Sequence, residues 1–94
     1  MSAERALPGG AAPYSRTPRF TEATVPQSLL REHSTKAGTH GLLHVDAGSV
    51  QYFLAGQETP AAEIAAGETF VILPEEVHFV RLGDGAAFWV EFCR

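Results

Sequence analysis

The sequence predicts an all-β domain of short antiparallel strands, arranged as a sandwich or a barrel. Short apolar runs recur along the chain between turn residues such as Gly, Pro, Asp and Ser, a pattern that predicts about six to eight strands. No segment of the folded part repeats apolar residues at helical spacing over two full turns. The chain has 94 residues, of which 45% are hydrophobic, which is enough for one small domain with its own core.

The expected strands follow one another from residue 39 onward. Runs 39–45 and 50–54 flank Asp46-Ala47-Gly48-Ser49, a tight-turn signal, and together they predict a β-hairpin. The alanine-rich stretch 61–66 fits either a helix or a strand, and its neighbours favour a strand. The remaining predicted strands are 70–73, 77–82 and 86–93.

Residues 1–12 are rich in Ala, Gly and Pro without any periodicity, and we predict that they form a flexible arm. The folded domain is therefore expected to span residues 13–94. It should begin with an extended segment around Pro13 and Pro18, since residues before proline favour extended geometry.

Composition and charge restrict the function classes. The formal net charge is −4, the pI is about 5.4, and Lys and Arg are scattered, so a nucleic-acid partner is not expected. No run is apolar enough to span a bilayer and no signal peptide is recognisable, so we expect a cytoplasmic protein without a membrane partner. The single cysteine, Cys93, agrees with a reducing compartment.

The most informative segment runs from Gly67 to His78. It reads as a turn glycine, a buried strand, a proline corner and a histidine that opens another apolar strand. With His78 facing inward, Val80 shares its face and Arg81 reaches water on the other. Two histidines and one carboxylate on a shared face would suit iron(II) or a similar divalent ion, and zinc with an open position is the alternative.

Glu91 is the candidate carboxylate. Both faces of the last predicted strand are largely apolar, and a buried carboxylate there needs a cation, which could be a metal ion, Lys36 or Arg31. A rim-exposed Glu91 near the chain end is an equal alternative. Lys36 is a candidate contact for an anionic ligand, against the alternative of a solvated turn lysine.

The other three histidines are open to more than one reading. His33 precedes a polar turn, which fits a residue at a barrel mouth or a surface residue. His40 and His44 share one face of their strand, opposite Leu43 and Val45, and this arrangement places them outward or at an interface.

Known enzyme motifs are absent from the sequence. There is no G-x-G-x-x-G, phosphate-binding P-loop, H-E-x-x-H or G-x-S-x-G. With no distinct general base, the sequence favours a binding module over a metal-dependent oxygenase or isomerase, which stays open as an alternative.

Several motifs together resemble the TehB/YeaR-like domain, a small cupin-like domain related to the N-terminal part of some tellurite-resistance B proteins. They are Pro13-Tyr14-Ser15-Arg16-Thr17-Pro18, Phe20-Thr21, the run from Leu30 to Thr39, Pro74-x3-His78 and Val90-Glu91-Phe92. The resemblance implies a cupin-like double-stranded β-helix, a jelly-roll barrel, with His33 and His78 as the family's recurrent histidines. Gly67-x6-Pro74-x3-His78 looks like a loosened second cupin motif, whereas the first cupin motif is not present in standard form.

The resemblance also sets the functional expectation. It implies a stand-alone domain that binds a divalent metal (Zn, Ni, Mn or Fe) or a small ligand such as an oxyanion, linked to tellurite or oxyanion stress. The expected metal ligands are His33, His78 and Glu91, with Lys36 and His40 as ligand-binding residues; His40 departs from the tryptophan usual in relatives. The methyltransferase half is missing, so no S-adenosylmethionine is expected. The alternative is a non-catalytic homodimeric sensor or interaction module without metal, and a homodimer is expected in either case.

Overall fold

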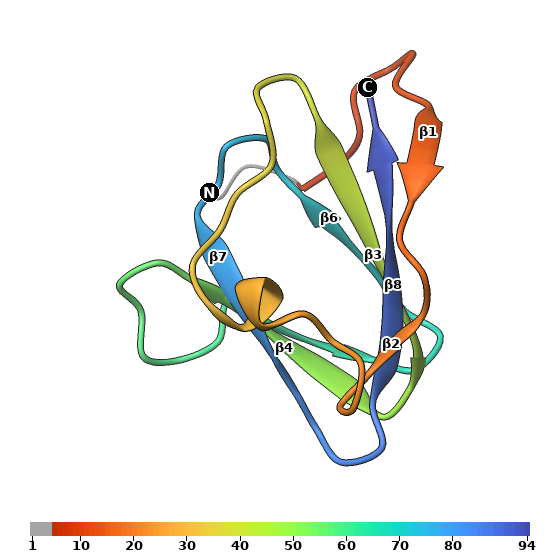
Figure 1. Ribbon diagram of the computed structural model, residues 1–94. Coiled ribbons are helices and arrows are strands. Elements are labelled where there is room, and N and C mark those ends of the chain that lie inside the picture. Colours follow the sequence, from red (N-terminus) through yellow and green to blue (C-terminus); the bar gives the residue numbers. More distant parts are fainter. Residues whose placement is uncertain (1–4) are drawn as a thin grey trace.

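The computed structural model describes residues 5–94, and residues 1–4 lie outside the described part (Figure 1). The described residues form strands and one short 3-10 helix, which in chain order are β1 Pro13–Arg16, β2 Phe20–Thr21, η1 Gln27–Leu30, β3 His40–Ala47, β4 Ser49–Leu54, β5 Ala62–Ala65, β6 Thr69–Ile72, β7 His78–Leu82 and β8 Ala87–Cys93. The predicted all-β class is confirmed, as is the strand in the alanine-rich stretch. No helix among residues 5–94 has the length and apolar character needed to cross a membrane.

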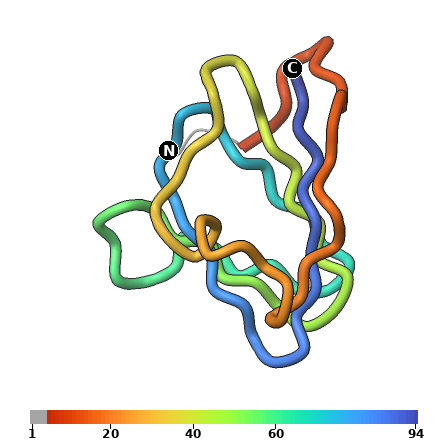
Figure 2. The backbone as a smooth tube through the Cα atoms, viewed as in Figure 1, coloured from red at the N-terminus to blue at the C-terminus, as the bar shows by residue number. Residues whose placement is uncertain are grey.

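The strands form two antiparallel sheets that face each other as layers (Figures 1 and 2). The larger sheet has the order β1-β8-β3-β6, with β2 also paired to β8, and the smaller has the order β5-β4-β7. Every pairing between these strands is antiparallel, as the sequence predicts. Over the described residues, the ladder hydrogen bonds do not join the two sheets into a closed barrel.

The predicted hairpin between β3 and β4 is wrong, because the two strands belong to different sheets. The chain crosses between the layers at Gly48, which has a φ of 63° and lies so close to the β7–β8 corner that an added Cβ would sit 2.8 Å from the Cα of Ala86. The chain does turn at residues 46–49 as predicted, but the close packing against Ala86 makes this turn a corner between the two sheets and not a hairpin. β4 instead pairs with β5, where Tyr52 lies opposite Ala62.

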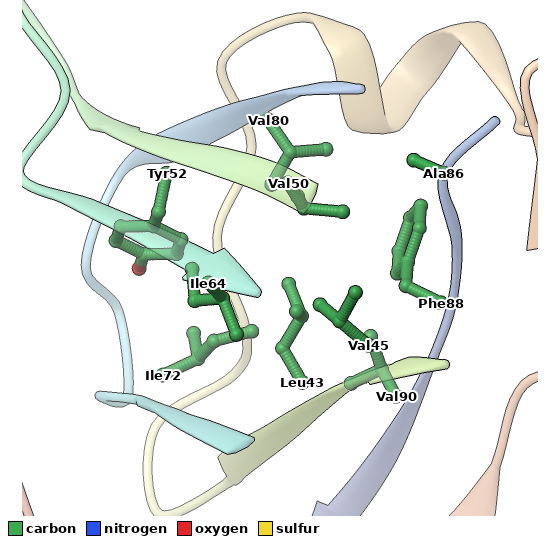
Figure 3. Close-up of a cluster of buried hydrophobic side chains, with 10 residues drawn as sticks. All are labelled: Leu43, Val45, Val50, Tyr52, Ile64, Ile72, Val80, Ala86, Phe88 and Val90. Atoms are coloured by element: carbon green, nitrogen blue, oxygen red, sulfur yellow. The ribbon is translucent and has the colours of Figure 1, made fainter. Parts of the chain in front are cut away.

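The core lies between the two sheets (Figure 3). Inward-facing side chains alternate along the strands as predicted, with Leu43 and Val45 buried on β3 and His78 and Val80 buried on β7, while Arg81 is exposed. Each buried aliphatic or aromatic side chain contributes about 1.5–3 kcal/mol of transfer free energy. The main cluster consists of ten side chains, Leu43, Val45, Val50, Tyr52, Ile64, Ile72, Val80, Ala86, Phe88 and Val90.

Part of the predicted arm contacts the folded domain. Its residues 1–4 lie outside the described residues. Ala12 and Arg94 exchange two backbone hydrogen bonds of 3.1 Å, and the Arg5 side chain contacts Glu76 at the corner before β7. The flexibility of the arm stays a prediction.

Candidate functional site

His33 and His78 lie next to each other because their backbones pair. His33 stands alone beside the edge strand β7 and exchanges two N–H···O bonds of 2.9 Å with His78. Directly opposed residues of an antiparallel pair project to the same side of the sheet. The two imidazole rings are therefore held with their centroids 4.2 Å apart.

The two rings make the same kind of hydrogen bond. Nδ1 of His78 lies 2.7 Å from the Glu76 carbonyl oxygen, and Nδ1 of His33 lies 2.8 Å from the Arg31 carbonyl oxygen. A carbonyl only accepts, so each Nδ1 carries the proton, and a neutral ring has its lone pair on Nε2. Within residues 5–94, the side-chain hydrogen bonds of both histidines are made by Nδ1 and not by Nε2. This is the arrangement in which imidazoles usually bind metals, with one nitrogen oriented by a carbonyl and the other free to coordinate.

The surroundings of His78 favour its neutral form. The residue is 1% exposed, and Tyr52 stacks on its ring at a centroid distance of 4.7 Å. Burial lowers the pKa of His78 below its ordinary value; the hydrogen bond to the Glu76 carbonyl opposes this effect, and the neighbouring His33 adds to it. His78 therefore keeps a lone pair on Nε2 at neutral pH.

Both histidines line a pocket of about 370 Å³ between the two sheets. The lining includes apolar side chains such as Ile72 of β6 and Val90 of β8, together with hydroxyl groups and the exposed Lys36. Small-molecule sites are typically apolar pockets of roughly 300–1,000 Å³ with a few convergent polar groups. The polar lining residues besides the two histidines are Tyr14, Thr17, Ser34, Thr35, Lys36 and Thr39.

Glu91 does not join the two histidines. Val90 faces the pocket, so the alternation of β8 directs the Glu91 side chain to the other face of the sheet. There the Glu91 carboxylate lies 2.8 Å from Nε2 of His44, whose ring stacks on Trp89 at 4.2 Å and whose Nδ1 bonds the Thr69 hydroxyl at 2.9 Å. His44 thus faces outward, one of its two predicted placements.

His40 also lies apart from the histidine pair. It is opposite Cys93 in the β3–β8 ladder and is not among the pocket-lining residues. Of the predicted site residues, the structure brings together His33, His78 and Lys36 around the pocket.

The pocket offers two imidazole nitrogens to a metal ion. Among residues 5–94, no three or more His, Cys, Asp or Glu side chains are grouped so that they could hold one ion. Two imidazole nitrogens would suit a divalent cation of the zinc, nickel or iron type, with water or ligand oxygen at its other positions. The set has one protein ligand fewer than the three usual at catalytic zinc sites.

Sequence reasoning missed a polar network behind His78. Tyr52 is 0% exposed and its hydroxyl donates to Glu76 at 2.7 Å, while the Arg5 guanidinium bonds both Glu76 oxygens. Burial would raise the pKa of Glu76, but the hydrogen bonds from Arg5 and Tyr52 bring it below its ordinary value. One signal was available: a tyrosine at an inward strand position needs a hydrogen-bond partner for its hydroxyl.

Comparison with known families adds an identification to this geometry. The family model described as the TehB-like domain matches residues 15–90, which is most of the chain. The chain belongs to the TehB-like domain family. The match covers both members of the histidine pair and the whole of strands β2 to β7.

Two solved structures resemble this TehB-like domain. A crystal structure of a protein from Escherichia coli (strain K12) is 26% identical, with 95% of each chain covered and a TM-score of 0.82. TehB from Haemophilus influenzae is 24% identical with a TM-score of 0.72, and this likeness shows the fold alone. The TehB alignment covers 90% of the present chain but only 32% of TehB. No curated protein matches the sequence.

Proposed function

We propose that this TehB-like domain is a cupin-like binding module that holds a divalent metal ion through Nε2 of His33 and His78. The observation that carries the proposal is the hydrogen-bonding pattern that the two rings share. Each Nδ1 atom bonds a backbone carbonyl, which leaves Nε2 as the nitrogen that can coordinate, and both residues line the pocket. The two facing antiparallel sheets support the cupin-like jelly-roll assignment, whose strands form such layers.

The ligand class follows from the charges at the pocket. A bound Zn²⁺, Ni²⁺, Mn²⁺ or Fe²⁺ would supply a positive centre that accepts oxygen donors. Lys36 at the mouth attracts anions, and the apolar wall formed by Ile72 and Val90 excludes water from the inner end. We therefore propose a small oxyanion as the ligand that completes the coordination. Glu91 and His40 have no role in this proposal.

The family relationship supports the same ligand class. TehB-like domains are related to tellurite resistance, and tellurite is an oxyanion. The alignment covers only 32% of TehB. We therefore assign to this chain neither the activity of the rest of TehB nor S-adenosylmethionine binding. We accordingly propose a role in oxyanion stress that depends on binding.

Metal titration of protein without an affinity tag tests the proposal. We expect calorimetry and elemental analysis to show uptake of one of Zn²⁺, Ni²⁺, Mn²⁺ or Fe²⁺. His33→Ala and His78→Ala should each weaken binding by more than about tenfold, the loss caused even by removing an outer-sphere partner. His40→Ala is the matched control, because this histidine is not among the pocket-lining residues.

Two outcomes would contradict the metal assignment. One is wild-type protein that takes up none of the four ions, and the other is an equal loss in His40→Ala and His78→Ala. Either result would favour the alternative, a non-catalytic dimeric sensor or interaction module, which light scattering would then test. With metal bound, adding tellurite or phosphate should displace metal-bound water in wild type but bind less well in Lys36→Ala.

A further inference from the structure

The guanidinium of Arg5 is enclosed by groups from three separate parts of the chain. Its Nε donates to the Val71 carbonyl at 3.0 Å, and its two terminal nitrogens donate to the two carboxylate oxygens of Glu76, one of them at 3.1 Å. Its central carbon lies 4.6 Å from the ring centroid of Phe70 and 5.4 Å from that of Tyr52. The contacts therefore combine in-plane hydrogen bonds with aromatic faces.

These contacts are specific for a guanidinium group. Three of its donors are used at once, two in a fork against a carboxylate and one toward a carbonyl, and an ammonium lacks the planar geometry to make this set. Aromatic faces within about 6 Å add cation–π attraction. A neutral group of the same shape would lose both the ion pair and this attraction.

The receiving groups are held by the folded domain independently of Arg5. Tyr52 is fully buried in β4 and donates its hydroxyl to Glu76 at 2.7 Å, which fixes one carboxylate oxygen. The corner before Glu76 is fixed as well, since Glu75 has a φ of 62° and its N–H bonds the Thr35 carbonyl at 3.2 Å. Arg5, in contrast, reaches these groups from 71 residues away along the sequence.

We propose that Glu76, Tyr52, Phe70 and the Val71 carbonyl form a binding site for a guanidinium group. Arg5 occupies this site from within the chain, and a small guanidinium compound takes its place when Arg5 is withdrawn. The site goes beyond the proposed function. It lies behind His78, on which Tyr52 stacks, but the lining of the metal pocket includes none of its four residues.

The energetics of an emptied site favour a replacement cation. Glu76 is part-buried, and without Arg5 its carboxylate would keep the Tyr52 hydroxyl but lose its counter-charge. A part-buried carboxylate without a counter-charge is costly, so a cation of matching shape gains affinity there. Arg5 competes as a tethered ligand with an effective concentration in the millimolar range.

Titration of full-length Arg5→Ala with methylguanidine tests the site. We expect saturable shifts of the Val71 and Glu76 amide signals in NMR spectra, and an apparent affinity about tenfold weaker in wild type, where Arg5 competes. Urea is a control with the same planar shape and no charge, and tetramethylammonium is a cation without N–H donors. Neither should bind, and Glu76→Gln in the Arg5→Ala background should abolish methylguanidine binding.

A stability measurement guards against loss of folding in the variant. A few millimolar methylguanidine should raise the Tm of Arg5→Ala but not that of wild type, since a ligand that binds only the folded state stabilises it. Arg5→Gln provides a second variant with a polar side chain. Metal uptake is measured on wild type and methylguanidine binding on the Arg5 variants, so failure of this site is distinguishable from failure of the metal proposal.

Three results would overturn the inference. They are no saturable binding of methylguanidine to either Arg5 variant, equal affinity in wild type and Arg5→Ala, and equal binding of urea. A wild-type dimer that becomes monomeric in Arg5→Ala would overturn the within-chain assignment, because Arg5 would then bind in the site of a second copy.

Discussion

His33 and His78 exchange two backbone hydrogen bonds of 2.9 Å, and this pairing sets their ring centroids 4.2 Å apart. The spacing is therefore fixed by the main chain and does not depend on a contact between the side chains. A substitution of either ring leaves both backbone bonds in place. Loss of metal binding in such a variant would then report the missing nitrogen and not a displaced strand.

Stability without metal should decrease as the pH falls below about 6.5, the ordinary pKa of histidine. The pKa of His78 is lowered in the folded protein by burial, so below pH 6.5 the unfolded chain binds a proton that the folded chain does not. The contribution of neutral His78 to the free energy of unfolding is thus fully present above pH 6.5 and is lost as the pH falls toward the lower pKa of the folded state. The groups around His78 are His33, Tyr52, Glu76 and Arg5.

Urea unfolding between pH 8 and pH 5, with a chelator present, measures this dependence. Glu76 also has a lowered pKa and lies near the ring. Its contribution to stability changes only below pH 4.5, its ordinary pKa, and therefore outside this pH range. His78→Phe should flatten the curve, because it removes the titrating group. An unchanged slope in His78→Phe would refute the assignment to His78.

Tyr52→Phe should destabilise the protein by about 1.5–3 kcal/mol, the usual contribution of a hydrogen bond to a charged group. The ring would keep its stacking on His78, while the Glu76 carboxylate would lose the hydroxyl at 2.7 Å. Denaturant unfolding gives the change in the free energy of unfolding. Tyr14→Phe is the control, because Tyr14 is 47% exposed and should change stability by less than about 0.5 kcal/mol. Equal small effects would show that the hydroxyl contributes nothing.

Gly48→Ala should be more destabilising than Gly56→Ala. Both glycines have positive φ, 63° and 79°, so alanine carries a backbone cost of about 1–2 kcal/mol at either position. Only at Gly48 would the new Cβ also meet backbone, 2.8 Å from the Cα of Ala86, whereas nothing lies within 4 Å at Gly56. Thermal unfolding of the two variants measures the difference. Equal losses would mean that the β3–β4 corner relaxes freely around the added methyl group.

Local patterns predicted the strands and their inward faces. The alternation of β7 placed His78 and Val80 inside and Arg81 outside because one face of a strand must be buried, and this requirement is visible in the sequence. The direction in which the chain leaves a turn is not visible there. The signal at Gly48 fitted a hairpin equally well, and only the packing against Ala86 makes it a corner between sheets.

The candidate site was predictable where the residues carry their own signal. His78 follows a proline corner at the start of an apolar strand, and a family motif pairs it with His33. Arg5 carries no such signal, because it lies in an aperiodic segment and its partner Glu76 is 71 residues away. Contacts of this range depend on the folded topology. The apolar residues on both faces of β8 suggested a buried Glu91, but the outer face of this strand is only partly buried, and there Glu91 bonds His44, which stacks on Trp89.

Glu91→Gln should leave metal affinity within about twofold of wild type, because the residue faces away from the pocket and distant sites act independently. The substitution keeps the size of the side chain but removes the charge that meets Nε2 of His44 at 2.8 Å. Its effect should therefore appear in the fluorescence of Trp89, on which His44 stacks. Metal titration followed by calorimetry, alongside an emission spectrum, separates the two effects. His78→Ala is the matched comparison and should lose metal without changing the Trp89 spectrum. A loss of metal affinity in Glu91→Gln as large as in His78→Ala would instead place the carboxylate in the metal site and contradict the two-histidine assignment.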